Sequence, residues 1–401
     1  MSELKNIAKR VQNIEISLIK KMPMYAHKLV LEKKWKAEEI VSLGQGIPAM
    51  PTPKYIRNAV IEELKSDEAI CKYSLQPGWP KLKNLIADIL TKKTNRDVNP
   101  ETEVFVSTGA MEALAVGMST LFEEGDEVII ANPSYSSHIE QAVFAGAKPV
   151  FVDLDPNNNW AFNVEQFKQS INNKTKALIL CNPANPTGMV IPKETLDEIV
   201  KIVVENNIFV FADETYGYLV FDNEKFISLL EYPELKDLLI YTYSFSKEFA
   251  MTGWRVGYMY APAYIIEQCL KIHDAFVICA PTVSQHAAYA ALTGTPYPED
   301  PNMVEVFDKQ RLYMCQRLDE LPDLFAYQKP KGAYYILAKY LKTGLKAKDF
   351  SIKLLEEIGV ITIPGTGFGP GGEGHIRLSF CATVENIKIA FDRIQEWNKN
   401  L

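Results

Sequence analysis

The chain has 401 residues, 47% of them hydrophobic and 23% charged, and its formal net charge is −7 because 50 acidic residues outnumber 43 basic ones. This length and composition predict a globular, enzyme-sized protein with a large core and two or three lobes. The acidic balance opposes a general affinity for nucleic acid, so we expect no nucleic-acid partner.

The N-terminal stretch before Met22 mixes charged and apolar side chains at helical spacing, and it lacks the uninterrupted apolar core of a signal peptide. No run approaches the about 18 apolar residues of a membrane span. We therefore expect a cytoplasmic protein with no membrane partner. The six cysteines and five histidines are scattered without metal-binding spacing, which predicts reduced cysteines and no metal.

Residues 1–40 have an amphipathic helical pattern. Val41 to Pro48 then predicts a short strand that runs into a glycine-proline loop, because Gly44 and Gly46 permit backbone conformations that other residues resist. Helices are predicted at 54–66 and 81–90. The turn between them contains Tyr73, which could be an ordinary aromatic residue in a turn.

Between residues 103 and 261, short apolar runs alternate with amphipathic helical patterns. Because the runs are apolar at consecutive positions, they predict strands that are covered on both faces in a mostly parallel sheet. We expect an α/β fold whose large domain has a seven-stranded sheet with helices on both faces. The expected strands are 104–106, 127–130, 149–152, 177–180, 208–212, 239–242 and 256–260, and the helices between them are 110–122, 137–145, 164–171 and 193–206.

Candidate site residues follow these strands, at the edge where α/β sheets bind ligands. Gly109 lies at a strand-to-helix junction with Ala110 and Met111, where free backbone N–H groups and the helix dipole favour a phosphate. Tyr135 could stack on a flat heterocycle or could belong to the core. Asn185 lies in the stiff loop Asn182-Pro-Ala-Asn-Pro-Thr-Gly, for which we find no structural need.

Asp213 ends the strand at 208–212, and Tyr216 follows it. A carboxylate at a buried strand end is costly unless it is paired, and a protonated pyridine nitrogen would be a suitable partner. After the next strand come Ser244, Lys247 and, eight residues beyond the lysine, Arg255. A primary amine forms a reversible imine with an aldehyde, while hydroxyl and guanidinium donors match a phosphate.

The C-terminal third predicts helices at 263–278, 284–292, 303–318 and 347–358, with a linker at 293–301. A hairpin is expected at 331–337, a strand at 360–363 and a flexible glycine-rich loop at 364–372. The alternating strand at 375–380 would bury Arg377. A buried guanidinium requires a planar anion such as a carboxylate.

The string from Ser244-Phe-Ser-Lys247 to Met251-Thr-Gly-Trp-Arg255-Val-Gly-Tyr258 resembles the pyridoxal-phosphate lysine segment of class I/II aminotransferases, the aspartate aminotransferase fold family of fold type I. The other motifs occur in family order from Gly44 to the final helix. The resemblance implies pyridoxal 5'-phosphate as cofactor and Lys247 as its catalytic Schiff base residue.

The resemblance also implies further roles. Tyr135 would stack on the pyridine, Asp213 would pair with its nitrogen, and Asn185 and Tyr216 would bind its ring oxygen. Gly109, Ala110, Met111, Ser244 and Arg255 would hold the phosphate, as would Tyr73 of the partner subunit. Gly46, Asn185 and Arg377 would bind the substrate carboxylate. The chain departs from the family pattern at Ala49-Met50 and at His138.

We therefore predict a homodimeric aminotransferase of aspartate-type or broad specificity with shared active sites. It would act on an L-amino acid and a 2-oxo acid by a ping-pong mechanism, with glutamate and 2-oxoglutarate as one pair. Residues 51–292 would form the large cofactor-binding domain, and 1–50 with 293–401 a smaller α+β domain. A β-lyase or decarboxylase on the same fold and a non-catalytic regulatory binding protein are the alternatives. Aspartate, aromatic amino acids, alanine and methionine all remain open as donors.

Overall fold

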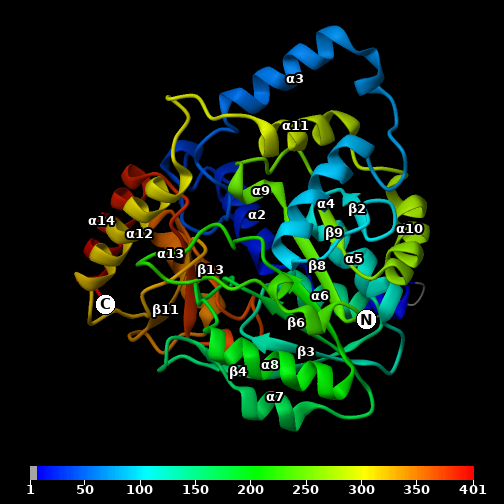
Figure 1. The fold of residues 1–401 in the computed structure, drawn as a ribbon. Helices are drawn as coiled ribbons and strands as arrows, with labels where there is room; N and C mark the ends of the chain where they lie inside the picture. Colours follow the sequence, from blue (N-terminus) through cyan, green and yellow to red (C-terminus); the bar gives the residue numbers. More distant parts are fainter. Residues whose placement is uncertain (1–6) are drawn as a thin grey trace.

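The largest sheet has eight strands in a computed structural model that describes residues 7–401 (Figure 1). Its strands, in spatial order, are β2 (Val104–Ser107), β9 (Gly257–Tyr260), β8 (Leu239–Ser244), β7 (Phe209–Asp213), β6 (Thr175–Cys181), β3 (Glu127–Asn132), β4 (Lys148–Asp155) and β5 (Ala161–Phe162).

All seven predicted strands of this sheet are present, and the neighbours from β8 to β4 are parallel. The eighth strand, β5, was not predicted: it has only two residues and pairs antiparallel with β4. β9 is antiparallel to both β2 and β8. The expectation of a mostly parallel α/β sheet is confirmed.

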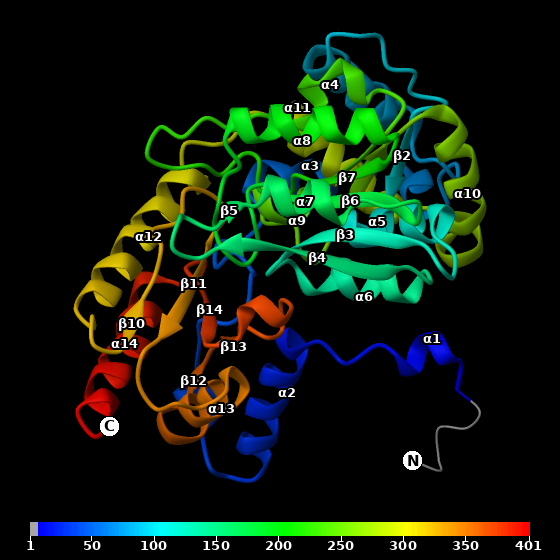
Figure 2. The same cartoon turned by 90° about the horizontal axis from the view of Figure 1, so that it is seen from below.

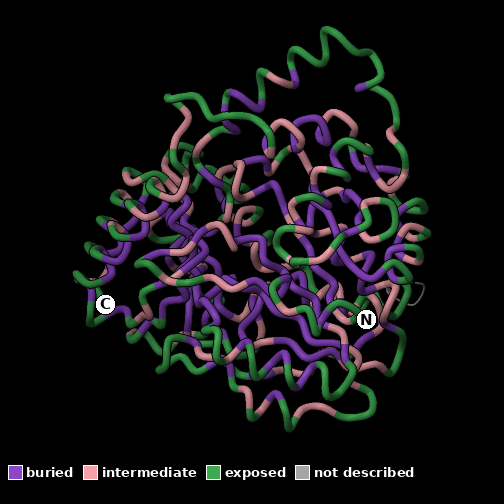
Figure 3. The backbone as a smooth tube through the Cα atoms, viewed as in Figure 1, coloured by how far each residue is buried: buried purple, intermediate pink, exposed green. Residues whose placement is uncertain are grey.

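Helices cover both faces of this sheet. Strand residues alternate between two cores, since Leu178 and Leu180 join one apolar cluster and Ile179 joins the other. This explains why the strand sequences are apolar at consecutive positions. Figure 3 shows that the backbone at the centre of the molecule is mostly buried. The helices of this part are α3 (Lys54–Ser66), α4 (Pro80–Thr94), α5 (Ala110–Leu121), α6 (Ser136–Phe144), α7 (Val164–Ser170), α8 (Lys193–Asn206), α10 (Ala263–Val277) and α11 (Thr282–Thr293).

Both ends of the chain contribute to a second, smaller layer (Figure 2). Met22 and Leu29 of the N-terminal helix α2 (Leu18–Leu31) pack in one cluster with Leu355 and Ile363. The division of the chain at residues 50 and 292 stays a prediction. This layer contains an antiparallel sheet of β10 (Phe325–Ala326), β11 (Tyr335–Tyr340), β14 (His375–Ser379) and β13 (Ile363–Pro364), the parallel pair β1 (Val41–Ser42) and β12 (Val360–Ile361), and helices α12 (Met303–Asp319), α13 (Ala347–Ile358) and α14 (Val384–Asn398).

Three predicted elements differ from the structure. Of the helix expected at 1–40, residues 1–6 lie outside the described part, and the remainder forms the short α1 (Lys9–Gln12), α2 and a 3-10 turn. The strand expected at 360–363 is divided into β12 and β13 at Thr362, whose buried hydroxyl donates to the Ser351 hydroxyl at 3.0 Å. The hairpin at 331–337 is wrong, since β11 begins only at Tyr335.

The glycine-rich loop at 364–372 was predicted to be flexible, and in the structure it is hydrogen-bonded to the end of β3 and the residues after it. The Phe368 carbonyl accepts from the Ser134 N–H at 2.8 Å, and the Gly371 N–H donates to Asn132 Oδ1 at 2.8 Å. A Cβ atom on Gly365 would lie 2.1 Å from the Gly372 carbonyl oxygen. These glycines allow close backbone approach, and the loop is held against the large sheet. Among the described helices, none has the length and apolar character needed to cross a membrane.

Candidate active site

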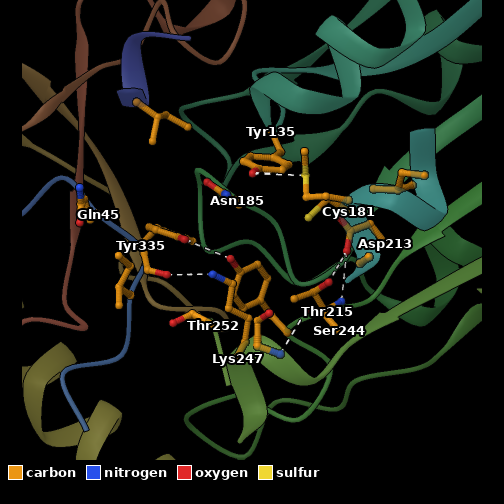
Figure 4. A pocket seen from close by; sticks show the side chains of 18 of the residues that line it. Gln45, Tyr135, Cys181, Asn185, Asp213, Thr215, Ser244, Lys247, Thr252 and Tyr335 are labelled. Atoms are coloured by element: carbon orange, nitrogen blue, oxygen red, sulfur yellow. Dashed lines mark hydrogen bonds between the residues drawn. The ribbon is translucent and has the colours of Figure 1, made fainter. Parts of the chain in front are cut away.

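A cavity of about 540 Å³ lies at the carboxyl ends of the large-sheet strands (Figure 4). Residues of β11, β14 and the start of α2 also line this cavity. The loops after β2, β3, β6, β7 and β8 each bring a predicted residue to it. Of the predicted site residues, the cavity is lined by Gly46, Ala110, Met111, Tyr135, Asn185, Asp213, Tyr216, Ser244, Lys247, Arg255 and Arg377.

An anion site is formed at the N-terminus of α5. Gly109 precedes the helix at φ +80°, and no side chain caps its free N–H groups. A Cβ atom on Gly109 would lie 2.8 Å from Nη2 of Arg255, so the guanidinium sits directly against this turn. The buried hydroxyl of Thr108 has no hydrogen-bond partner. Helix N–H groups, a guanidinium and a free hydroxyl suit a phosphate.

Lys247 follows β8 on the short helix α9 (Phe245–Glu248). Its Nζ donates to the Gly46 carbonyl at 2.8 Å and lies 6.0 Å from the centre of the Tyr334 ring. Burial, together with the nearby cations Arg377 and Arg255, lowers the pKa of Lys247 to about 8. A substantial fraction of this amine is therefore neutral near pH 8, which is the form that attacks an aldehyde.

The Asp213 carboxylate is buried at the end of β7 and is fully hydrogen-bonded. Its Oδ2 lies 3.0 Å from Nε2 of His138, and its Oδ1 accepts from the Thr215 hydroxyl at 2.6 Å. Burial alone would raise the pKa of Asp213, but the bonds and charge of His138, followed by the bonds from Thr215, bring the pKa below its ordinary value. The carboxylate is thus kept ionised and can pair with a cation in the cavity.

Aromatic and amide groups surround the remaining space. Figure 4 shows Tyr135 and Lys247 on opposite sides of the view, with Asn185 beside Tyr135. The Tyr135 hydroxyl lies 3.7 Å from the Met111 sulfur. The Tyr216 hydroxyl lies 3.0 Å from that of Tyr335, and both rings are buried. If a flat ring bound between Tyr135 and Lys247, polar groups of the protein would lie along the edges of that ring.

Arg377 on β14 is 1% exposed. One of its Nη atoms donates to Asn185 Oδ1 at 3.0 Å, and the other donates to the Gly44 carbonyl. Its guanidinium lies 4.3 Å from the centre of the Tyr335 ring. The buried Nε has no partner, and no carboxylate within residues 7–401 forms an ion pair with Arg377. An unpaired buried guanidinium beside a cavity is suited to bind a carboxylate from outside.

Two predicted residues are not lining residues. Gly109 lies behind the cavity, directly against Arg255. Tyr73 is 78% exposed on the surface and contributes nothing to the cavity of its own chain. This position agrees with the expectation that Tyr73 acts on a partner subunit but does not test it.

Sequence reasoning did not assign several groups that the structure brings to the site. His138 was noted only as a departure from the family pattern, although it is fully buried against Asp213. Lys20 and Ile19 reach the cavity from α2, and no local motif marks them. No group of three or more His, Cys, Asp or Glu side chains in the described part of the chain could hold a metal ion.

Comparisons with known proteins agree with this geometry. The family model for aminotransferase class I and II matches residues 38–394. An aspartate aminotransferase of Pyrococcus abyssi is 36% identical over 90% of this chain and 92% of its own length, and an aromatic-amino-acid aminotransferase of Thermococcus litoralis is 33% identical with the same coverage. The structure of an aspartate aminotransferase from Thermotoga maritima superposes with a TM-score of 0.88 at 31% identity, covering 98% of this chain and all of that one.

Proposed function

The chain belongs to the class I and II aminotransferases and is a pyridoxal-phosphate-dependent enzyme of fold type I, and we propose how its residues serve the reaction and which substrates it takes. We propose that the amino group of an L-amino acid is moved to a 2-oxo acid, with glutamate and 2-oxoglutarate as one pair. Relatives are named for aspartate and for aromatic amino acids.

The cofactor supplies a protonated pyridine ring that withdraws electrons from the substrate α-carbon. We assign Asp213, supported by His138 and Thr215, to the ring nitrogen, because it is a buried carboxylate kept ionised. The α5 N-terminus and Arg255 would hold the phosphate. Lys247 would bind the aldehyde and, once released, move a proton at the substrate α-carbon.

The observation that supports the substrate role of this site is the unpaired guanidinium of Arg377. Its Nε lacks a partner, while its two Nη atoms are held by Asn185 and Gly44. This arrangement fixes the plane of the guanidinium before a ligand arrives, which favours a bidentate bond to a planar α-carboxylate.

The experiment is a spectroscopic half-reaction. Purified holoenzyme is mixed with single amino acids, and the conversion of the cofactor absorbance is followed with and without 2-oxoglutarate. We expect conversion by at least one L-amino acid and its reversal by 2-oxoglutarate, with one new amino acid formed per oxo acid consumed. Release of ammonia without any acceptor would instead indicate a β-lyase, and release of carbon dioxide a decarboxylase.

We further propose a homodimer in which Tyr73 completes the partner's phosphate site. Tyr73 is 78% exposed, and Leu75, two residues further on, is 64% exposed. Hydrogen bonds hold this surface together, since the Gln76 amide donates to the Leu270 carbonyl at 2.6 Å. Two large side chains exposed within three residues support a protein interface at this place. A cytoplasmic location remains our prediction, and the six unpaired cysteines support it.

A further inference from the structure

We propose that Lys20, at the start of α2, binds the distal carboxylate of dicarboxylic substrates and so gives this enzyme its preference for acidic amino acids. This inference rests on the proposed function, because it concerns the second carboxylate of a substrate whose first carboxylate is bound by Arg377. It names a specificity residue that lies far in sequence from every cofactor-binding segment.

The charges of the cavity lead to this assignment. Five charged side chains line it, and four have roles that the reaction requires: Asp213, Lys247, Arg255 and Arg377. Lys20 is the fifth, and it has no ion pair among the described residues, although several neighbouring lysines do. A cation in a substrate cavity that serves neither the cofactor nor the α-carboxylate is suited to a second anion on the substrate.

The fold fixes the backbone of Lys20, whose side chain is exposed at the cavity. The buried face of α2, with Met22 and Ala26, packs into an apolar cluster of the smaller layer. On the other side, the hydroxyl of Ser17 lies 3.2 Å from that of Ser136 at the start of α6. The first turn of α2 is therefore anchored to both layers at the cavity, and a charge on this turn is held by a rigid element.

The rest of the lining suits the aliphatic part of such a substrate. Ile19, Met111 and Leu114 are apolar and line the same cavity as Lys20. Methylene groups can contact these side chains while the terminal carboxylate reaches the ammonium. The same apolar surface can also accept an uncharged side chain, so Lys20 would set the preference among substrates without being required for turnover.

The test compares Lys20→Gln with Lys21→Gln. Lys21 lies on the same turn of α2 and does not line the cavity; its ammonium is 3.9 Å from Glu15. Single-turnover half-reactions are measured with glutamate and glutamine and with aspartate and asparagine, which differ in the charge of the side chain at nearly constant shape. Lys20→Gln should lower kcat/KM for the two acidic donors by roughly 5- to 50-fold and leave the two amides within about twofold.

Further measurements separate charge from structure. Lys20→Arg should retain most of the difference in kcat/KM between acidic and amide donors. Lys21→Gln should retain all of this difference. High salt should reduce the preference in the unmodified enzyme, since an exposed ion pair is screened. Unchanged melting temperature and cofactor absorbance in Lys20→Gln would show that the site is intact.

The outcomes distinguish this inference from the proposed function. Lys20→Gln could change kcat/KM for acidic and amide donors by the same factor, or leave kcat/KM for all four donors unchanged while the unmodified enzyme transfers their amino groups. Either result would show that the role of Lys20 is wrong without contradicting the aminotransferase site. If no amino acid converts the cofactor of the unmodified enzyme, the proposed function itself fails.

Discussion

Among single residues, the Lys247 amine gives a direct prediction for pH dependence. Its pKa is lowered to about 8, first by burial and then by two nearby cations. Below this pH the amine is mostly protonated, so the nucleophilic fraction falls about tenfold for each further pH unit. The rate at which the apoenzyme takes up pyridoxal phosphate should therefore rise steeply from pH 6 to 8 and level off above about 9.

Stopped-flow absorbance after mixing apoenzyme with cofactor measures this rate. Lys247→Ala is the control, because it removes the amine and should show no covalent phase at any pH. A rate that continues to rise up to pH 10 or beyond would contradict the lowered pKa, since that is the behaviour of an ordinary lysine.

His138 gives a second prediction. Replacing it with phenylalanine removes the donor that lies 3.0 Å from Asp213 Oδ2 and leaves a buried carboxylate oxygen unpaired. Such a loss costs about 1–3 kcal/mol, so we expect His138→Phe to release the cofactor roughly 5- to 150-fold more readily. His138→Gln keeps an N–H donor near the same position and should retain more cofactor. Equilibrium dialysis at graded cofactor concentrations distinguishes the two variants, and equal retention would show that the contact is unimportant.

The sequence predicted which residues line the cavity better than it predicted their contacts. Asp213 and Arg377 were identified because a buried carboxylate and a buried guanidinium each require a particular partner, whereas Lys247 was identified from the longer string that resembles the family's lysine segment. The pairing of His138 with Asp213 could not be read from the sequence, because it joins helix α6, which follows β3, to the end of β7, and β6 separates these two strands in the sheet. Lys20 was missed for the same reason.

Among the loops and helices, the turn at Gly46 gives a third prediction. A Cβ atom at this position would lie 1.9 Å from the Tyr335 hydroxyl, which is buried and bonded to Tyr216. Gly46→Ala must therefore displace Tyr335 or the loop whose carbonyl accepts from Lys247. We expect a loss of at least about tenfold in kcat/KM, with the fold retained.

Gly253→Ala is the matched control for this variant. Gly253 lines the same cavity, but a Cβ atom there meets nothing within 4 Å. Its activity should stay within about twofold of the unmodified enzyme. Normal turnover by Gly46→Ala, measured in the same half-reaction, would contradict this prediction. It would show that the loop accommodates the added Cβ atom without a loss of activity.

Elements were predicted where one physical signal dominates. The strands of the large sheet were found because both faces of each strand are covered, which makes the sequence apolar throughout. The antiparallel direction of β9 has no such signal, since a buried strand has the same composition in either direction. The glycine-rich loop at 364–372 was predicted to be flexible, but its glycines allow close backbone packing. A run of glycines in the sequence is compatible with either property.

For the whole molecule, the sequence predicted an association of both chain ends, but only through the family resemblance. The structure gives its physical basis: the Leu43 N–H donates to the Ile361 carbonyl at 2.9 Å, and the Leu43 carbonyl accepts from the Ser379 N–H at 2.7 Å. These bonds join segments more than 300 residues apart. Periodicity describes only local structure, so it cannot predict such contacts.

Subunit sharing gives the last prediction, and Tyr73 makes it testable. Tyr73 is 78% exposed and lies outside the cavity of its own chain. In a heterodimer of a Tyr73→Ala chain and a Lys247→Ala chain, sharing would place both lesions in one site and leave the other site intact. If Tyr73 acts within its own chain, each site carries one lesion.

Co-expression with two different affinity tags allows the heterodimer to be purified and compared with both parent homodimers at limiting cofactor. With sharing, the heterodimer should bind one cofactor tightly and covalently and should recover about half of the activity of the unmodified dimer, because one of its two sites is complete. Absorbance of the bound cofactor counts these sites independently of turnover. A heterodimer no better than its parents, or a protein that sediments as a monomer at micromolar concentration, would show that Tyr73 does not cross to a partner subunit.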